Sequence, residues 1–482
     1  MTGSVVALFL WSLEQVTSIR LEHGWLLFLL PVGGALIGLV YKKVGRSVEA
    51  GNNLIVEEIH EPSGGIPRRM APLVFIATIV THLFGGSAGR EGTAVQLGGS
   101  IASFFARLFG MDRQSSRIML MAGIACGFGA VFGTPLAGAV FALEVLTIGS
   151  MEYSALIPCL MAGVMGDIVC RAWGVHHMLY QIPANLVPSP RGFFQPEWWL
   201  IFEVAVASIL FGLASVLFAE MAHGLGRFFK RTIKQEILRP FVGGVIIIGL
   251  TYLIGSRDYL GMGEYSTDPH SVTIVSAFHL GGATPFSWFW KLLLTAVTQS
   301  SGFKGGQVTP LFFIGATLGN LISVLFHSPP ALFAALGFVA VFAGATNTPL
   351  ACTIMSVELF GSEYLLYFAI ACFLSYFFSS HSGIYRSQRV AIPRDGLPAE
   401  PDKPSSDTLL GTHLRPKPSM FALLRERILG PSLATSQIET SEIASSETAS
   451  SETAASQAPN SPKVDNDDIA SSNAAATDDR NR

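Results

Sequence analysis

Long apolar runs separated by short polar segments occupy most of the chain up to about residue 390. A helix needs roughly 20 mostly apolar residues to cross the hydrocarbon core of a bilayer. With their flanks, the following runs predict membrane-crossing helices: Trp25 to Tyr41, Met70 to Gly86, Ile118 to Phe132, Ser154 to Val169, Trp199 to Ala219, Phe241 to Ile254 and Ala331 to Ala345. Other runs are shorter, contain or adjoin glycine, and predict half-helices: Leu97 to Phe109, Pro135 to Leu146, Leu311 to Phe326 and Pro349 to Phe360.

Half-helices at membrane depth restrict the kinds of protein to consider. Lipid cannot hydrogen-bond the freed backbone groups, so a broken helix is tolerated only where it is buried in protein or lines a cavity. Transporters use such breaks to build ion sites. The 49 glycines of the chain fit close helix packing as well as these interruptions. Packing alone explains how many glycines there are, but not where they cluster.

The first apolar segment, Met1 to Leu21, resembles a membrane helix more than a signal peptide. It has no basic residues at its start, and Arg20, Glu22 and His23 follow without a small-residue cleavage site. We therefore expect a retained first span, so short for a bilayer that part of it could precede Met1.

Composition supports a membrane protein and excludes other classes. Half of the 482 residues are hydrophobic, and the mean hydropathy is +0.47, too apolar for a soluble protein. The formal net charge of −3 gives no basic field for nucleic acid, so we expect no nucleic-acid partner. The five cysteines lie in apolar runs without metal-ligand spacing. We read them as small core residues, and expect no metal and no cofactor.

The chain also repeats its polar landmarks. The sequence Thr-Pro-Leu-Ala begins at Thr134 and again at Thr348, and in both copies a glutamate, Glu144 or Glu358, follows the proline by nine residues. Residues 89–93 and 306–310 each open an apolar helix that contains glycine. Two related halves result, at about residues 26–171 and 198–385. Interrupted helices at corresponding positions of two repeats indicate a transporter site near the bilayer midplane.

After residue 392 the sequence changes to Ser, Thr, Ala, Glu, Asp and Pro. This composition buries too little apolar surface to offset the entropy of ordering, so we expect a membrane domain at residues 1–392 and a disordered tail at 393–482. A short amphipathic helix around Met420 to Leu429 is possible. Basic residues beside the spans predict the cytoplasmic side, and with it a cytoplasmic tail. They are Lys42, Lys43, Arg46, Arg68, Arg69, Arg227, Lys230, Arg231, Lys234, Arg386, Arg389 and Arg394.

The segment from Gly85 to Thr93 carries the most specific chemistry. Its glycines leave the backbone bare just before a helix, and the first turn of a helix presents unpaired N–H groups with partial positive charge. This predicts an anion site. Glu91 would compete with the anion as a tethered carboxylate and could leave when protonated. A helix-start acid stabilised by the dipole is the ordinary alternative, but a carboxylate within a membrane segment is usually functional.

Here the sequence resembles the CLC family of chloride channels and transporters. Gly-Arg-Glu-Gly at residues 89–92 is similar to the family's GREGP motif, with Thr93 in place of the proline. Residues 306–310 resemble the GxFxP motif, with Val308 at the phenylalanine position. The resemblance extends from about Leu26 to Arg389. It implies an all-α, CLC-type membrane fold of two inverted-topology repeats, whose broken half-helices meet at a midplane anion site.

Three variants resemble the fluoride-exporting branch of this family. Asn52 replaces the serine of the family's GSGIP motif, and it stands beside Thr93 and the Gly-Gly-Gln-Val-Thr-Pro variant at residues 305–310. Fluoride is small and tightly hydrated, so a selective site must replace water with strong donors such as the Asn52 amide and the Thr309 hydroxyl. Asn52 could also be a plain turn residue. Tyr385 matches the tyrosine that faces the inner end of the pore in this family, although it could be a membrane-interface residue.

By this resemblance Glu91 would be the gating and proton-coupling residue. The anion-binding residues would be Asn52, Gly89, Arg90, Gly92, Gln307, Val308, Thr309 and Tyr385. The resemblance also implies fluoride/proton antiport and fluoride resistance, in a homodimer of the bacterial inner membrane. The partners would be fluoride or chloride, protons and the lipid bilayer.

Two positions depart from the family's patterns. Glu144 matches the first residue of an acidic pair in chloride/proton antiporters, but Val145 stands where their inner proton-transfer glutamate would be. Protons must then enter by another route, and the fluoride branch is similar in lacking that glutamate. The fluoride branch often has glutamate at the position of Gln307, so this amide leaves sidedness and coupling open.

Other readings compete with fluoride export. A chloride channel or chloride/proton antiporter shares every structural argument and treats the variants as neutral. An intramembrane serine protease would use the G-x-S-x-G pattern around Ser87, with His82 or His381. That pattern is weak among so many glycines and leaves the repeat unexplained, so we do not expect an enzyme. Phe303, Phe312 and Phe313 could touch an anion with their ring edges, but are more often core.

Overall fold

The computed structural model describes residues 1–391 except 179, 181, 183–196, 267 and 381. The chain divides into two units, Met1–Lys417 and Pro418–Arg482, and every described residue belongs to the first. The predicted tail at residues 393–482, with its possible helix around Met420 to Leu429, lies outside the described residues.

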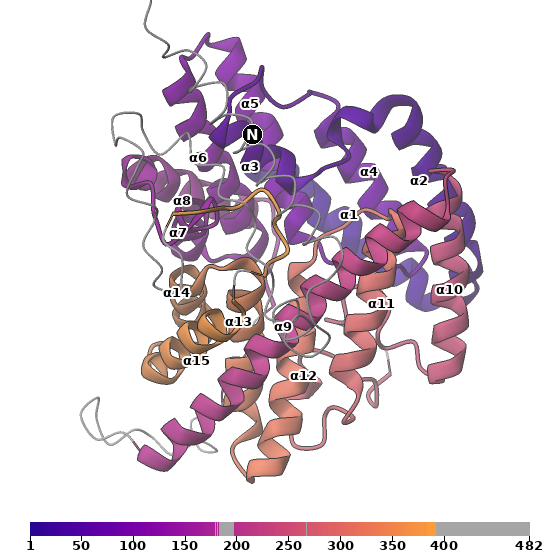
Figure 1. The fold of residues 1–482 in the computed structure, drawn as a ribbon, viewed down its shortest axis with the longest axis vertical. Coiled ribbons are helices and arrows are strands. Elements are labelled where there is room, and N and C mark those ends of the chain that lie inside the picture. Colours follow the sequence, from indigo (N-terminus) through magenta and orange to yellow (C-terminus); the bar gives the residue numbers. More distant parts are fainter. Residues whose placement is uncertain (179, 181, 183–196, 267, 381, 392–482) are drawn as a thin grey trace, which may run out of the picture. The chain divides into compact units, whose positions relative to one another are not determined.

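The described residues are mostly helical, with little strand, as predicted (Figure 1). The α-helices are α1 (Thr2–Glu22), α2 (Leu30–Val40), α3 (Asn52–His60), α4 (Met70–Leu83), α5 (Glu91–Leu108), α6 (Arg113–Phe132), α7 (Pro135–Glu144), α8 (Leu156–Ala172), α9 (Trp198–Thr232), α10 (Leu238–Ile254), α11 (Ser287–Ser301), α12 (Val308–Phe326), α13 (Pro330–Thr346), α14 (Pro349–Phe360) and α15 (Leu365–Phe378). Shorter helices are η1 (Gly24–Leu29), η2 (Tyr41–Gly45), η3 (Arg46–Val48), η4 (Tyr153–Ala155) and η5 (Ser276–Phe278). Strands β1 (Thr147–Ile148) and β2 (Arg389–Val390) form a parallel pair.

Several helical segments have the length and hydropathy needed to cross a membrane. Among the described residues they are Gly24–His60, Arg113–Phe132, Tyr153–Ala172, Trp198–Thr232 and Val308–Phe326. The last one contains the run Leu311 to Phe326, for which the sequence predicts a half-helix. The helix begins three residues earlier because Pro310 stands in its first turn, where a missing N–H removes no helical hydrogen bond.

Glycine allows very close helix contacts at corresponding places in the two halves. A Cβ atom on Gly98 of α5 would lie 2.0 Å from the carbonyl oxygen of Gly123 in α6. A Cβ atom on Gly315 of α12 would lie equally close, 2.0 Å, to the carbonyl oxygen of Gly337 in α13. Both Gly98 and Gly315 come seven residues after the first residue of their helix. The predicted role of glycine in packing therefore holds at equivalent contacts of the two repeats.

Helices α7 and α14 lie side by side and cap each other (Figure 1). The Glu144 carboxylate at the end of α7 accepts hydrogen bonds from the backbone N–H groups of Leu350 (3.1 Å) and Ala351 (2.8 Å) at the start of α14. Glu358 of α14 does the same for the second and third residues of α7, at 2.9 and 2.8 Å. The repeated Thr-Pro-Leu-Ala and glutamate landmarks thus satisfy N–H groups that a helix start leaves unpaired.

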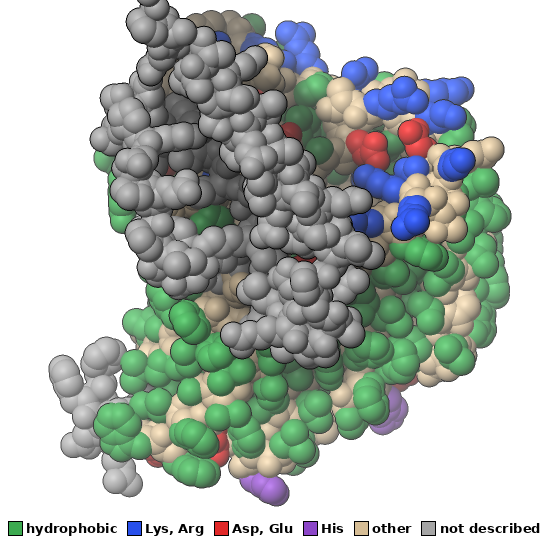
Figure 2. Space-filling view, in the orientation of Figure 1, with side chains coloured by type: hydrophobic (Ala, Val, Ile, Leu, Met, Phe, Trp, Pro, Cys, Tyr) green, Lys and Arg blue, Asp and Glu red, His purple; other side chains and the backbone are tan. Residues whose placement is uncertain are grey.

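The outside of the helical bundle is largely apolar. Figure 2 shows hydrophobic side chains covering much of the visible face. On α9, for example, Trp198 is 78 % exposed and Trp199 is 71 % exposed, and on α10 Leu253 is 79 % exposed. Water makes so much exposed apolar surface unfavourable, whereas lipid accommodates it. The surface therefore fits a protein that resides in a membrane.

The reciprocal caps generate a prediction about stability. Replacing Glu358 with Ala leaves N–H groups of α7 without their charged acceptor, and we expect it to lower the free energy of unfolding by about 2 kcal/mol. Glu144→Ala should have an effect of similar size, because it removes the equivalent cap from α14. Thermal unfolding in detergent would measure both. Glu363→Ala, an exposed glutamate just after α14, is the control. A Glu358→Ala protein as stable as this control would contradict the prediction.

Candidate functional site

The two broken segments predicted from the repeat meet in the interior of the protein. The N–H group of Gly89 donates to the carbonyl of Gly306 (2.7 Å), and the N–H group of Gly306 donates back to the carbonyl of Gly89 (2.6 Å). A Cβ atom on Gly306 would lie 2.8 Å from the backbone nitrogen of Gly92 and 3.1 Å from that of Glu91. The first turns of α5 and α12 are therefore held face to face, and only glycine fits between them.

Glu91 lies at this meeting point and is fully buried. Its carboxylate accepts hydrogen bonds from the backbone N–H and the hydroxyl of Thr309 in the first turn of α12, the former at 3.1 Å. It also accepts the N–H of Arg90 at 3.1 Å. The side chain of one half thus occupies the start of the helix of the other half. A carboxylate in this position is stabilised, because helix starts attract negative charge.

Asn52 and Gly92 lie beside this carboxylate site. Asn52 is the first residue of α3, after Gly51 with a φ of 60°. A Cβ atom on Gly92 would lie 3.1 Å from the amide nitrogen of Asn52 and 3.1 Å from the Cα of Gly306. The amide oxygen of Asn52 is buried and, among the described residues, has no hydrogen-bond partner. The start of α3 therefore joins the starts of α5 and α12.

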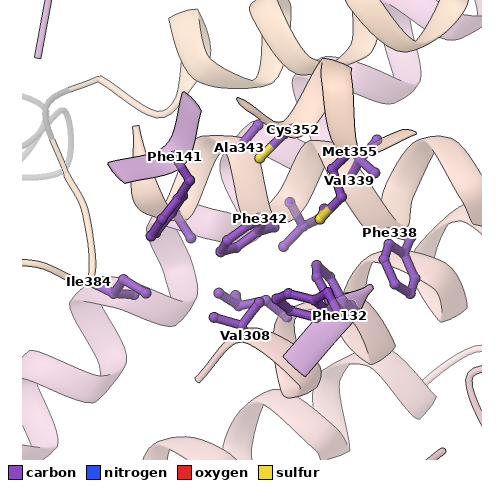
Figure 3. Packing of buried hydrophobic residues seen from close by; sticks show 14 of the residues in the cluster. Phe132, Phe141, Val308, Phe338, Val339, Phe342, Ala343, Cys352, Met355 and Ile384 are labelled. Atoms are coloured by element: carbon purple, nitrogen blue, oxygen red, sulfur yellow. The ribbon is translucent and has the colours of Figure 1, made fainter. Parts of the chain in front are cut away.

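Val308 and Gln307 face different surroundings at the start of α12. Val308 is buried among aromatic and aliphatic side chains that include Phe132, Phe338 and Phe342 (Figure 3). Phe312, one helical turn later, stacks on Phe338 with ring centroids 3.8 Å apart. This cluster makes one wall of the region apolar. Gln307 is only partly buried.

The other two phenylalanines considered above belong to different contacts. Phe303 packs against α2, because a Cβ atom on Gly34 would lie 2.6 Å from the end of its ring. Phe313 lies under the ammonium group of Lys291, 5.2 Å from the ring centroid. With Phe312 stacked in the core, these contacts are those of packing residues.

Tyr385 is buried in a segment that the rest of the protein holds tightly. Three residues later, the Gln388 amide donates to the carbonyl oxygens of Val145 (2.8 Å) and Thr346 (2.7 Å). The N–H of Ser387 donates to the Asn53 side chain of α3 at 3.2 Å. These bonds connect the segment to α7, α13 and α3. They fix Tyr385 relative to the helix that begins with Asn52.

Thr93 does not face the carboxylate site. Its hydroxyl is 2.8 Å from that of Thr78, so it joins α5 to α4. The proline-to-threonine change at this position adds a contact between two helices. A hydroxyl lost inside α5 would leave Thr78 without this partner.

Sequence reasoning missed several side chains that shape the site. Gln299 of α11 donates its amide to the carbonyls of Gly305 (3.3 Å) and Gly306 (3.1 Å). Nη1 of Arg90 forms an ion pair at 3.1 Å with Oε2 of Glu264, which lies in the loop after α10. Nε of Arg90 lies 3.5 Å from Oε1 of Glu91. Gln299 and Glu264 lie outside any recognisable motif. Glu264 lies far along the chain from Arg90, so no local pattern marks it, whereas Gln299 lies six and seven residues before its partners, at the end of α11 and outside the motif itself.

Among the described residues, Ser87 and His82 do not form the hydrogen-bonded pair that a serine protease would need. The Ser87 hydroxyl lies 2.9 Å from the Tyr259 carbonyl and 2.9 Å from the Thr295 hydroxyl. Both ring nitrogens of His82 lie near backbone carbonyls, those of Thr78 and Ala88. His381 lies outside the described residues. Ser87 and His82 therefore serve structural hydrogen bonds.

The arrangement as a whole is suited to anions. Helix starts and a hydroxyl converge on one buried point, and a removable carboxylate fills it. In the part of the chain that the structure describes, no group of three or more His, Cys, Asp or Glu residues could hold a metal ion. The available chemistry is binding and release of a small anion, together with proton uptake on a carboxylate.

The contact between the two broken segments generates a second prediction. Gly306→Ala would push apart the starts of α5 and α12, at a penalty of about 1–3 kcal/mol. We expect halide binding to weaken by roughly tenfold or more. Titration calorimetry of the purified protein would measure it. Gly249→Ala in α10 is the matched control, because a Cβ atom there meets no atom within 4 Å. Equal halide binding by the two variants would show that the close approach of the two helix starts does not contribute to binding.

Comparisons with known proteins agree with this geometry. Residues 33–380 match the family described as voltage gated chloride channel. A relative from Pseudomonas syringae pv. tomato, named chloride/fluoride channel protein, is 49 % identical over 390 residues, covering 81 % of this chain and 84 % of the relative.

Solved structures show the same fold. A CLC-type fluoride/proton antiporter has a TM-score of 0.75 and 33 % identity, covering 81 % of this chain and 95 % of the other. A slow cyanobacterial chloride/proton antiporter has a TM-score of 0.65 and 21 % identity, covering 80 % and 93 %. The matched family extends over both broken segments and over every helix from α3 to α15. The protein is therefore a member of the CLC family, with that family's all-helical membrane fold.

Proposed function

We propose that this protein exports fluoride across the bacterial inner membrane in exchange for protons. The observation that carries the proposal is the Glu91 carboxylate, bound by the backbone N–H and the hydroxyl of Thr309. An anion that replaces this carboxylate meets the same donors. Proton uptake neutralises the Glu91 carboxylate, which weakens its attraction to these donors and lets the side chain leave the site. Anion entry and proton uptake are then linked through one site.

The donors around this point favour a small, strongly hydrated anion. Fluoride gives up water only for short, strong hydrogen bonds, which hydroxyl and amide groups supply. The Thr309 hydroxyl already reaches the carboxylate, and the Asn52 amide lies beside Gly92. Oxygen and nitrogen of an amide are assigned from their partners. The buried Asn52 oxygen has no partner among the described residues, so an anion could turn the NH2 group toward itself.

The names of the relatives also support fluoride as the transported ion. The Pseudomonas syringae relative is named for both chloride and fluoride, and the structural neighbour at 33 % identity is a fluoride/proton antiporter. Chloride transport remains the second candidate because the relative's name includes it. The choice depends on how strongly Asn52 and Thr309 prefer the smaller ion.

Because Val145 replaces the second acid of the acidic pair, protons need another route from the inner side to Glu91. Val145 is buried and apolar, and the Glu144 carboxylate is bound to the start of α14. We propose that Glu144 acts as a helix cap here and that protons reach Glu91 along the segment that holds Tyr385. In this proposal the anion is bound by Asn52, Gly89, Arg90, Gly92, Gln307, Val308, Thr309 and Tyr385, with the backbone of Gly92 and Val308 contributing N–H groups and Gly89 holding the two helix starts together through Gly306.

We also propose how the protein is oriented in the membrane and how it assembles. The membrane domain would comprise residues 1–392, with the basic ends of α2 and α9 in the cytoplasm. Lys42, Lys43, Lys230 and Arg231 are exposed there. Figure 2 shows Lys and Arg side chains gathered at one end of the visible face. Two copies would associate as a homodimer with one pathway each.

A flux assay tests the choice of ion. Liposomes that contain the purified protein and are loaded with fluoride or chloride should release fluoride at least roughly tenfold faster, which corresponds to about 1.4 kcal/mol of selectivity. Ion-selective electrodes measure both rates. An inward proton gradient should accelerate fluoride release. Equal release of the two halides, or faster chloride, would rule out the fluoride assignment.

The role of Glu91 gives a separate prediction. Glu91→Gln keeps the shape of the side chain but cannot take up and release a proton, so we expect fluoride movement to become insensitive to a pH gradient. Proton movement with fluoride, followed by a pH-sensitive dye inside the liposomes, should fall to background. Glu363→Gln, on an exposed residue, is the control and should remain coupled. Intact proton-driven transport in Glu91→Gln would show that the coupling residue lies elsewhere.

A further inference from the structure

Glu264 is a nearly buried carboxylate that none of the motifs described above includes. It lies in the loop between α10 and α11 and is 8 % exposed. Its Oε2 is 3.1 Å from Nη1 of Arg90. A carboxylate so far from water is unfavourable unless it is paired, and Arg90 is the partner that the described residues supply within 4 Å.

The loop that carries Glu264 is held in place from two sides. The fully buried Lys291 of α11 donates to the carbonyl oxygens of Gly261 (2.7 Å) and Tyr259 (3.2 Å). Ser87, from the segment before α5, donates to the same Tyr259 carbonyl at 2.9 Å. The carboxylate is thus anchored to the segment that leads into Arg90 and Glu91.

Gly263 brings the loop still closer to the site. Its φ of 80° is in the left-handed region, and a Cβ atom there would lie 2.6 Å from the Phe313 ring of α12. Its carbonyl accepts the N–H of Ile274 at 2.9 Å. Glu264 therefore follows a residue packed directly on the helix whose first turn binds Glu91. The position of its side chain is set by the same helices that form the anion site.

Arg90 is shared between two carboxylates. Its Nη1 lies 3.1 Å from Glu264, whereas its Nε lies 3.5 Å from Glu91 and makes no hydrogen bond within the described residues. The better of the two contacts belongs to Glu264. Without Glu264, the Arg90 guanidinium would interact through its charge and its N–H donors with Glu91 alone of the two carboxylates. Glu264 therefore weakens the attraction between Arg90 and the carboxylate that must leave.

We propose that Glu264 is a positioning residue which, by holding Arg90, sets the pH range in which Glu91 exchanges its proton and admits the anion. The inference rests on the proposed function, because it assigns the proton to Glu91. No covalent step is involved: Glu91 gains or loses a proton, and Arg90 remains paired with Glu264 in both states. The charge next to Glu91 then stays constant during the cycle.

Other ionisable groups are close enough to act on Arg90, Glu91 or Glu264. They are Cys170 of α8, His177 and Tyr180 after α8, Lys291 of α11 and Tyr385 after α15. None of them differs between the variants compared below. Their contribution is therefore common to all of the measurements.

The test is the pH profile of proton-coupled fluoride flux in Glu264→Gln. Loss of this negative charge leaves Arg90 to stabilise the ionised form of Glu91, so a higher proton concentration is needed. We expect the pH of half-maximal coupled flux to move about one unit toward acid. Glu264→Asp, which keeps the charge on a shorter side chain, should move it less in the same direction. If Glu264→Gln does not fold, the Asp variant carries the test, and an unmoved profile overturns the proposal.

Two comparisons separate this proposal from general effects. Asp268→Asn removes one charge from the same loop at an exposed residue whose carboxylate accepts the N–H of His270, 2.9 Å away, and should leave the profile in place. An equal shift in this control, or a Glu264→Gln profile that superimposes on the unchanged protein, overturns the role of Glu264.

The last comparison uses Glu91→Gln as the background, where fluoride flux itself is followed against pH because proton-coupled flux should be absent. Adding Glu264→Gln should have no further effect on the pH dependence there, because the residue through which Glu264 acts is already uncharged. A pH dependence of fluoride flux that Glu264→Gln introduces in that background shows that Glu264 acts without Glu91, and overturns the inference alone. Persistent proton coupling in Glu91→Gln itself instead defeats the proposed function.

Discussion

The reciprocal hydrogen bonds between Gly89 and Gly306 are the contact on which the rest of the structure depends. A helix that stops inside a membrane leaves N–H groups that lipid cannot satisfy. Here the residues just before two such helices pair with each other, and the first turns of the helices then point at one buried place, where Glu91 of one helix accepts the N–H of Thr309 in the other. Because a Cβ atom on Gly306 would collide with the start of α5, the approach exists only with glycine. The partial positive charge of both helix starts is concentrated by this geometry.

A concentrated positive potential without an anion is itself unfavourable, and the protein fills it with its own carboxylate. Glu91 belongs to one half and is bound by Thr309 of the other. The side chain is therefore part of the fold and part of the site at once. The donors of Thr309 face this carboxylate, and in the proposed function they face the anion that replaces it.

The two halves exchange groups at other places as well. Glu144 and Glu358 cap each other's partner helix, and Gln388 connects the Tyr385 segment to α7 and α13. Each exchange satisfies polar groups that would otherwise be buried alone. The same principle extends to Arg90, whose charge is divided between Glu91 and Glu264. Stability and the balance of charge at the site thus come from one network of polar contacts between segments distant in sequence.

The sequence alone determined the class of fold and indicated the centre of the candidate site. Apolar runs, glycine-broken segments and the repeated proline and glutamate landmarks required an all-helical membrane protein with two halves, because periodicity and hydropathy are local properties. The position of Glu91 before a helix likewise indicated an anion site. Only the tertiary structure decided that Glu144 is a cap, that Thr93 binds Thr78, and that Gln299, Lys291 and Glu264 shape the site. Most of these side chains act between segments that are distant in sequence, and hydrogen bonds between remote segments leave no periodic or local pattern to detect.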